Sequence, residues 1–177
     1  GAKIVRDRPF SSYLSSRGGW IWEIFIKSFT ISLFVVLIFT AYDFAFTGSS
    51  FNNGLPIYII ILTILIAPFQ CFAEELHFRG FLMQTVGSWI RVPIVVIVIQ
   101  AIIFAYLHSY NLIALLSIVC TGIIFGLIAW YSKGLEISTA MHSANNILSA
   151  LTISLSTTIT LWDSAEMIIQ MMVIVVL

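Results

Sequence analysis

Five ionisable side chains lie inside or at the end of long apolar runs: Glu74, Glu75, Arg79, His108 and His142. At the centre of a bilayer a charged side chain costs about 2.5–3.5 kcal/mol on insertion scales, so residues of this kind mark a functional site by default. A carboxylate can activate water, an imidazole can orient it, and polar donors can stabilise the oxyanion that forms when an amide is attacked. This set of side chains therefore predicts hydrolysis of an amide bond.

The spacing gives the two adjacent carboxylates different roles. Glu75 and Arg79 are four residues apart and share one face of a helix, so an internal ion pair is predicted. Glu74 lies about 100° further round the helix, out of direct reach of Arg79. We therefore predict that Glu75 is structural and that Glu74 is catalytic. His77, two residues from Glu75, points elsewhere and is interpreted as non-catalytic.

Two more pairs have the same four-residue spacing, Phe104 with His108 and His142 with Asn146. If the three helices converge, one carboxylate, two imidazoles and one carboxamide line a common cavity. Each residue also has a simpler interpretation. His108 would be a polar cap near the headgroups, and Asn146 would be an interhelical hydrogen bond worth about 0.6 kcal/mol. The simpler interpretations would all have to hold independently, although the three pairs share the same spacing. We therefore favour a single site.

The elements that position these residues are predicted to be membrane-spanning helices. Hydrophobic residues form 60% of the 177-residue chain and charged residues only 9%, and the mean hydropathy is +1.05. A soluble domain carries about 25% charged residues. Several runs approach the roughly 20 apolar residues that cross a bilayer, without the alternation of a transmembrane barrel. We predict an all-α fold, a polytopic transmembrane helix bundle.

About six spans are expected. They are placed at 21–45, 55–86, 92–108, 112–131 and 135–156, with the sixth starting after Asp163 and Glu166. This divides the chain into a basic N-terminal arm (1–19), a first span and loop (20–54), a catalytic core of four helices (55–156) and the start of a further span (157–177). Since no methionine precedes Gly1 and the last run is still apolar at Leu177, we expect truncation at either end.

The basic residues fall on one side of the alternating spans. The N-terminal arm, Arg91 and Lys133 lie on this side, whereas the opposite loops carry Asp43, Asp163 and Glu166 and no Lys or Arg. The positive-inside rule therefore places the N-terminal arm in the cytoplasm. The formal net charge is zero, which gives no indication of a nucleic acid partner.

Two smaller features are interpreted as packing. Gly122 and Gly126 form a GxxxG pair, which predicts close approach of two helices and no chemical role. Cys71 and Cys120 are taken as small residues within membrane helices.

A count of helical rise leaves one mismatch. At about 1.5 Å per residue, His108 lies about 24 Å from Val92, whereas Glu74 lies about 28 Å from Leu55 at the other end of its own span. Straight spans would therefore place the two side chains at different depths.

The three motifs resemble those of the CPBP family, the CAAX-protease and bacteriocin-processing membrane proteins. EELHFR (74–79) resembles the family's EExxxR motif, FAYLH (104–108) its FxxxH motif and HSANN (142–146) its HxxxN motif, in the family's order. The resemblance covers about 55–150. It implies an intramembrane endopeptidase, here in a prokaryotic plasma membrane. Eukaryotic members remove the C-terminal tripeptide of prenylated CAAX proteins, and prokaryotic members are linked with peptide maturation, bacteriocin self-immunity and surface-protein processing.

By motif position, the resemblance implies that Glu74 and His108 activate water and that His142 and Asn146 hold the oxyanion. The supporting residues are Glu75, Arg79 and Phe104. Members are often labelled metalloproteases, and Glu74, His108 and His142 would be the zinc ligands. The chain has no HExxH helix, so chemistry without a metal cofactor is favoured and zinc is kept as the alternative.

Two other functions stay open. One is a catalytically silent scaffold or bacteriocin-immunity protein that uses the same cavity for binding. The other is a small transporter, which would normally show inverted repeats that are not found here. The expected partners are the lipid bilayer and a hydrophobic or membrane-anchored peptide or protein substrate, with no nucleic acid, and the sequence does not indicate an oligomeric state.

Overall fold

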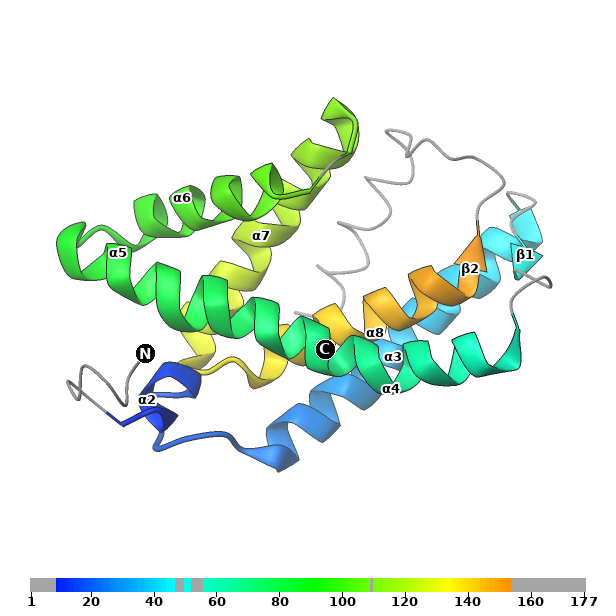
Figure 1. Ribbon diagram of the computed structural model, residues 1–177, viewed down its shortest axis with the longest axis horizontal. Helices are drawn as coiled ribbons and strands as arrows, with labels where there is room; N and C mark the ends of the chain where they lie inside the picture. Colours follow the sequence, from blue (N-terminus) through cyan, green and yellow to red (C-terminus); the bar gives the residue numbers. More distant parts are fainter. Residues whose placement is uncertain (1–8, 47–49, 52–55, 109, 154–177) are drawn as a thin grey trace.

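The computed structural model (Figure 1) describes residues 9–46, 50–51, 56–108 and 110–153. Its helices are α2 (Ser11–Leu14), α3 (Trp22–Phe46), α4 (Ile57–Glu75), the π-helix η1 (Leu76–Leu82), α5 (Met83–Trp89), α6 (Pro93–Tyr106), α7 (Leu112–Ser132) and α8 (Glu136–Leu151). Two short strands, β1 (Ser50–Phe51) and β2 (Thr152–Ile153), pair in antiparallel orientation. The predicted sixth span and the basic residues of 1–8 lie outside the described residues.

The all-α fold class is confirmed. Three described segments are long and apolar enough to cross a membrane: Trp22–Phe46, the continuous Ile57–Trp89 and Leu112–Ser132. α6 and α8 are shorter, at 14 and 16 residues. The protein is an integral membrane protein. The fifth predicted span was expected to reach residue 156, but α8 ends at Leu151, where the chain pairs with β1 as a strand.

The second span is not regular α-helix throughout, contrary to the sequence prediction. α4 continues past Pro68, but π-helix replaces α-helix over Leu76–Leu82. Gly80 in this segment lies against α2, because a Cβ there would stand 2.8 Å from the carbonyl oxygen of Tyr13. π-Helical turns are frequent at functional sites. The π-helical segment is therefore the part of the long helix against which α2 packs.

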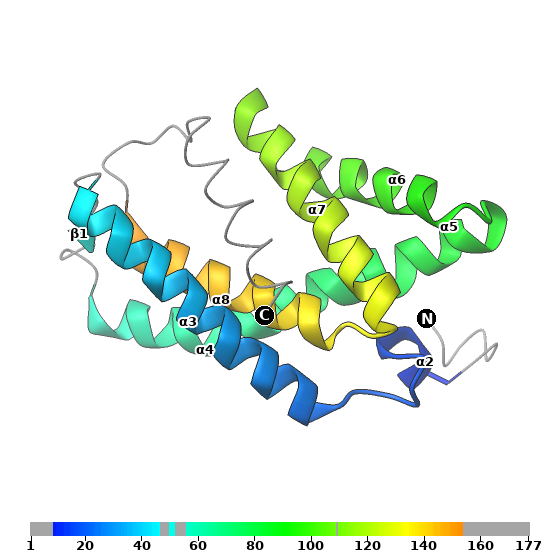
Figure 2. The same ribbon diagram turned by 180° about the vertical axis from the view of Figure 1, so that it is seen from behind.

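Helix α8 lies alongside α3 and α4 in both views (Figures 1 and 2) and holds many of the buried residues of the bundle. It contacts α3, α4 and α7. Its apolar side joins a core that includes Val35, Phe125 and Met141. The polar residues in the first half of α8, Glu136 to Ser143, are also buried, and Ser143 Oγ donates to the Thr139 carbonyl at 2.7 Å. Apolar packing thus holds α8 in place while its polar side faces the interior.

The residues before α3 pack onto the connection between α7 and α8. Ser16 N donates to the Lys133 carbonyl at 2.9 Å. Glu136, fully buried at the start of α8, pairs with Arg17 at 3.0 Å and accepts a hydrogen bond from Ile21 N at 3.0 Å. A buried carboxylate needs partners of this kind. The start of α3 and the start of α8 therefore fix one another.

The GxxxG pair brings α6 and α7 into close contact. A Cβ at Gly122 would lie 2.9 Å from Ala101 Cβ and 3.1 Å from Ala101 Cα. A Cβ at Gly126 would lie 2.8 Å from Gln100 Nε2 and 2.9 Å from Ile97 Cγ2. Distances this short leave no room for a side chain. The predicted packing role is confirmed.

Gly122→Ala should destabilise the protein by about 1–3 kcal/mol, because the added methyl group meets the backbone of α6 and overpacks the contact. Thermal and denaturant unfolding in detergent would measure the change. Gly87→Ala is the matched control, since the nearest atom to a Cβ there is 3.9 Å away. It should be neutral or slightly stabilising, because alanine favours helix over glycine. Equal unfolding transitions for the two variants would contradict the packing argument.

Candidate active site

The Glu75–Arg79 ion pair expected from the spacing is present at the centre of the bundle. Arg79 Nη1 lies 3.0 Å from Glu75 Oε1, and both side chains are fully buried. The guanidinium also lies 4.6 Å from the ring centre of Phe104 and 5.5 Å from that of Phe125, and its Nη2 donates to the Gly122 carbonyl at 3.3 Å. A buried cation is tolerated where an anion, a carbonyl and aromatic faces surround it. Helices α4, α6 and α7 supply these partners around η1.

His142 of α8 stands between the two carboxylates of α4. Its Nδ1 lies 3.1 Å from Glu75 Oε1. A carboxylate accepts hydrogen bonds, so Nδ1 carries the proton and the ring is oriented by Glu75. The other ring nitrogen, Nε2, lies 3.7 Å from Glu74 Oε2. Arg79, Glu75, His142 and Glu74 thus form one continuous chain of polar contacts inside the membrane bundle.

Glu74 has a different environment from its neighbour, as the sequence predicted. Its side chain is 26% exposed, whereas that of Glu75 is fully buried. It accepts a hydrogen bond from Gln70 Nε2 at 3.2 Å, and Arg79 makes its ion pair with Glu75. Glu74 therefore presents the more accessible carboxylate of the pair.

Phe104 connects His108 to this group. Its ring lies edge-on to His142, with centroids 6.2 Å apart, and 4.8 Å from the ring of Phe78. The ring centroids of His108 and Phe104 are 4.8 Å apart. The ring of Tyr110 stacks against that of His108, with centroids 6.1 Å apart. His108 Nδ1 lies 2.8 Å from the Phe104 carbonyl, which can only accept. Nδ1 therefore donates, and Nε2 of a neutral ring keeps its lone pair.

The depth mismatch disappears when both residues are counted from the turn that their helices share. The continuous segment Ile57–Trp89 is longer than one crossing needs. Glu74 lies fifteen residues before Trp89, and His108 lies fifteen residues after Pro93. At the α-helical rise of about 1.5 Å per residue, both are about 22 Å along the chain from the α5–α6 connection. The count from the sequence differed because it measured Glu74 from residue 55, at the opposite end of its segment.

The structure brings most of the predicted residues together, but not all. Direct contacts join Glu74, Glu75, Arg79, Phe104 and His142. His108 adjoins them through Phe104. Asn146 lies one turn after His142 on α8 and is half-buried, and no hydrogen bond among the described residues joins it to the group. His77 is exposed, with Nδ1 2.7 Å from the Ala73 carbonyl, away from the site.

Sequence reasoning missed Gln100 and the polar role of Gly122. Gln100 is fully buried, and its Nε2 donates at 2.8 Å to the Gly122 carbonyl, which also accepts from Arg79. A glycine has no side chain to cover its carbonyl, so the packing motif also supplies an acceptor. Gln100 was detectable, because it is the only polar side chain in 92–105 and lies four residues before Phe104.

The residues expected for zinc do not assemble as a ligand set. Within the part of the chain that the structure describes, no group of three or more His, Cys, Asp or Glu side chains is placed to hold a metal ion. His142 Nε2 and Glu74 Oε2 converge, but His108 reaches them only through Phe104. A catalytic zinc usually takes three protein ligands. The arrangement does not fit this requirement, and no chemical step is derived from a metal.

Glu75→Gln should lower the free energy of unfolding by about 3–5 kcal/mol, because it leaves the buried Arg79 without its counter-ion. Glu74→Gln is the matched control. It removes the same charge one residue away, and should change stability by no more than about 0.5 kcal/mol, because Glu74 is partly exposed and is not the counter-ion of Arg79. Denaturant titration in detergent measures both. If the two variants were equally stable, the ion pair would not be the structural element of the site.

Comparison with known proteins identifies the family of this chain. The family profile described as Type II CAAX prenyl endopeptidase Rce1-like matches residues 53–148, which include every residue of the site. The chain is also 29% identical over 157 residues to the uncharacterized protein YyaK of Bacillus subtilis (strain 168). That match covers 82% of this chain and 52% of YyaK, so the chain spans about half the length of this relative. No solved structure matches. The chain belongs to the Rce1-like family of type II CAAX prenyl endopeptidases, a family of proteases.

Proposed function

We propose that the protein is an intramembrane endopeptidase that hydrolyses a peptide bond in a membrane-associated or hydrophobic peptide. The observation that carries the proposal is the placement of His142 between Glu74 and Glu75 in the centre of a membrane helix bundle. Family membership supports the same reaction. Groups that can take up a proton and groups that can donate one lie within a few ångströms of each other, as amide hydrolysis requires.

Glu74 is proposed to activate water together with His108. Its carboxylate is half-buried and is not the ion-pair partner of Arg79, so it is free to accept a proton. Nε2 of a neutral His108 is an acceptor because Nδ1 donates to the Phe104 carbonyl. Water would lose a proton to Glu74 as its oxygen attacks the peptide carbonyl carbon. Glu74 would then return this proton to the leaving amine nitrogen as the carbon–nitrogen bond breaks.

His142 and Asn146 are proposed to hold the oxyanion. Glu75 accepts from Nδ1 and fixes the ring, so a ring that carries both protons points its Nε2–H toward the side of Glu74. Asn146 lies one turn further on the same helix and brings an amide donor. Donors fixed before the reaction stabilise developing charge without reorganisation. Arg79 and Phe104 then act by holding Glu75 and His142 in place.

The membrane setting favours a substrate that is itself apolar or lipid-anchored. The sequence pattern of basic loops supports a cytoplasmic N-terminal arm, and the bacterial relative supports a prokaryotic plasma membrane. The type of substrate named in the family description, a prenylated CAAX protein, gives a first probe.

Glu74→Gln should lower the turnover of a quenched fluorescent peptide carrying a prenylated cysteine by about 10²–10⁴-fold, the range for loss of a general base. Melting temperature in detergent should stay close to that of the wild type. Glu23→Gln is the control, because Glu23 is an exposed carboxylate whose partner is Lys27, far along the chain from the site. It should keep full turnover.

Comparison of membrane-peptide termini in cells that carry the wild type or Glu74→Gln extends the test to unlipidated substrates. Loss of specific cleaved termini in the variant is expected. If both cell lines show the same termini and the same cellular phenotype, the protein is a scaffold or immunity protein that binds without cleaving.

Removal of divalent metals should leave the rate unchanged, since the described donors do not form a three-ligand zinc site. The measurement is peptide turnover after exhaustive dialysis against a strong chelator, with metal content determined on the same sample. Loss of turnover that added Zn²⁺ restores would contradict the metal-free mechanism and would support the zinc alternative.

A further inference from the structure

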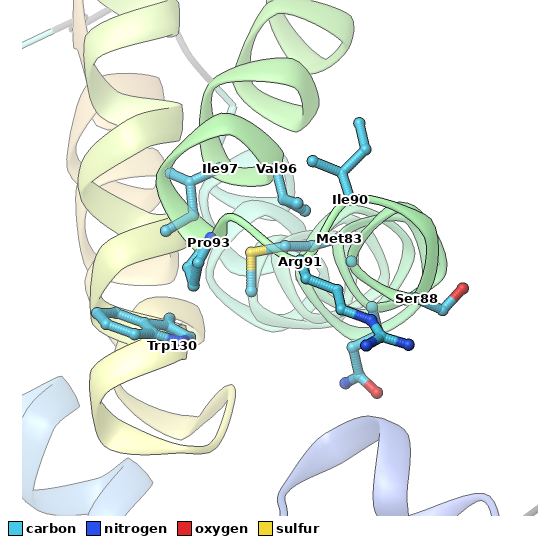
Figure 3. Close-up of a pocket in the computed structure, with 10 residues that line it drawn as sticks. Met83, Ser88, Ile90, Arg91, Pro93, Val96, Ile97 and Trp130 are labelled. Carbon is cyan, nitrogen blue, oxygen red and sulfur yellow. The ribbon is translucent and has the colours of Figure 1, made fainter.

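Two cavities adjoin at the end of the bundle where α5 turns into α6 and α7 ends. The first, of about 460 Å³, is mostly apolar, and Figure 3 shows Met83, Val96, Ile97 and Trp130 around it, with Arg91 at its edge. Its volume lies in the range of about 300–1,000 Å³ that is usual for ligand pockets. It is an apolar groove with a cationic mouth.

The second cavity, of about 730 Å³, is more polar. Its wall includes Ser12, Ser16 and Lys133. Met83, Gln84 and Trp130 line both cavities, so the apolar groove and the polar cavity are neighbours. Neither cavity has an Asp or Glu among the described residues that line it. Together they form a site with one apolar part and one polar part. Arg91 lines the apolar part, and Lys133 and the ion-paired Arg79 line the polar part.

Two exposed basic residues of this site, Arg91 and Lys133, form no ion pair with a described carboxylate. Of the basic residues that the structure describes, Arg17, Lys27 and Arg79 are in ion pairs with carboxylates. Arg91 and Lys133 are in none among the described residues, and both are exposed. Arg91 lines the first cavity, and Lys133 lines the second beside Arg79, whose charge is paired with Glu75.

The same end of the bundle carries exposed aromatic rings. Trp89 ends α5 and is 80% exposed, and Trp130 and Tyr131, near the end of α7, are 53% and 86% exposed. Tryptophan and tyrosine concentrate at the level of the lipid headgroups. Arg91 and Lys133 therefore lie where phosphate groups of the membrane are found, and the groove lies on the acyl side.

We propose that these two cavities bind one anionic phospholipid of the surrounding membrane. An acyl chain lies in the groove between α5, α6 and α7, Arg91 binds the phosphate at its mouth, and the polar headgroup reaches toward Lys133. A guanidinium matches a phosphate through paired hydrogen bonds. Basic pockets between membrane helices are a recurring way to bind anionic lipid headgroups. The site does not depend on the peptidase function proposed above.

The test uses purified protein in a neutral detergent, titrated with phosphatidylglycerol or phosphatidylcholine and followed by native mass spectrometry. Phosphatidylglycerol should bind more tightly than phosphatidylcholine. Arg91→Gln and Lys133→Gln should each weaken phosphatidylglycerol binding about fivefold, as expected for loss of one charge near a lipid surface. Lys27→Gln removes the same charge from an exposed pair on α3 and should leave binding unchanged.

A second variant tests the groove without touching a charge. Gly87 lines the apolar cavity, and the nearest atom to a Cβ there, Val96 Cγ1, is 3.9 Å away. Gly87→Leu therefore fills the groove without forcing helices apart, and should weaken phosphatidylglycerol binding at least about tenfold while the melting temperature in lipid-free detergent is kept.

Three outcomes would overturn the proposal. The first is equal binding of phosphatidylglycerol and phosphatidylcholine by the wild type, which would remove the role of charge. The second is unchanged binding in Gly87→Leu, which would remove the groove. The third is displacement of the lipid by inorganic phosphate at equal concentration, which would show that the cations bind a free phosphate and not a lipid.

Discussion

One buried cation organises the interior of this membrane protein. Arg79 has no access to solvent, and its charge would be costly in hydrocarbon without compensation. Glu75, the Gly122 carbonyl and the rings of Phe104 and Phe125 surround it. These partners come from α4, α6 and α7, so three helices must converge on η1 if the guanidinium is to be satisfied. The ion pair is therefore a constraint on the packing of the whole bundle.

The proposed chemistry depends on this constraint through Glu75. Oε1 of Glu75 accepts from Arg79 and from His142, so the position of the arginine fixes that of the imidazole. α8 must be in place for this contact. Apolar packing against α3 and α7 holds its middle, and the buried Glu136 ties its start to Arg17 and to the start of α3. The residues before the first span thus support the site from a distance.

At the contact between α6 and α7, one glycine allows close packing and also supplies a hydrogen-bond acceptor. Gly122 has no side chain, so Ala101 packs against it and its carbonyl is open to Arg79 and Gln100. A larger residue would separate the helices and cover the acceptor. At Gly87 of α5 the absence of a side chain leaves a groove instead, because the nearest atom of Val96 would be 3.9 Å from a Cβ there.

The sequence by itself determined what depends on local helix geometry and on composition. The all-α membrane fold, the Glu75–Arg79 pair and the shared faces of Phe104 with His108 and of His142 with Asn146 follow from the 3.6-residue period. Only the tertiary structure decided which faces meet. It placed His142 between the two carboxylates, joined His108 to them through Phe104 and introduced the π-helix. These depend on where helices cross and turn, and contacts between distant segments leave no periodic signal in one sequence.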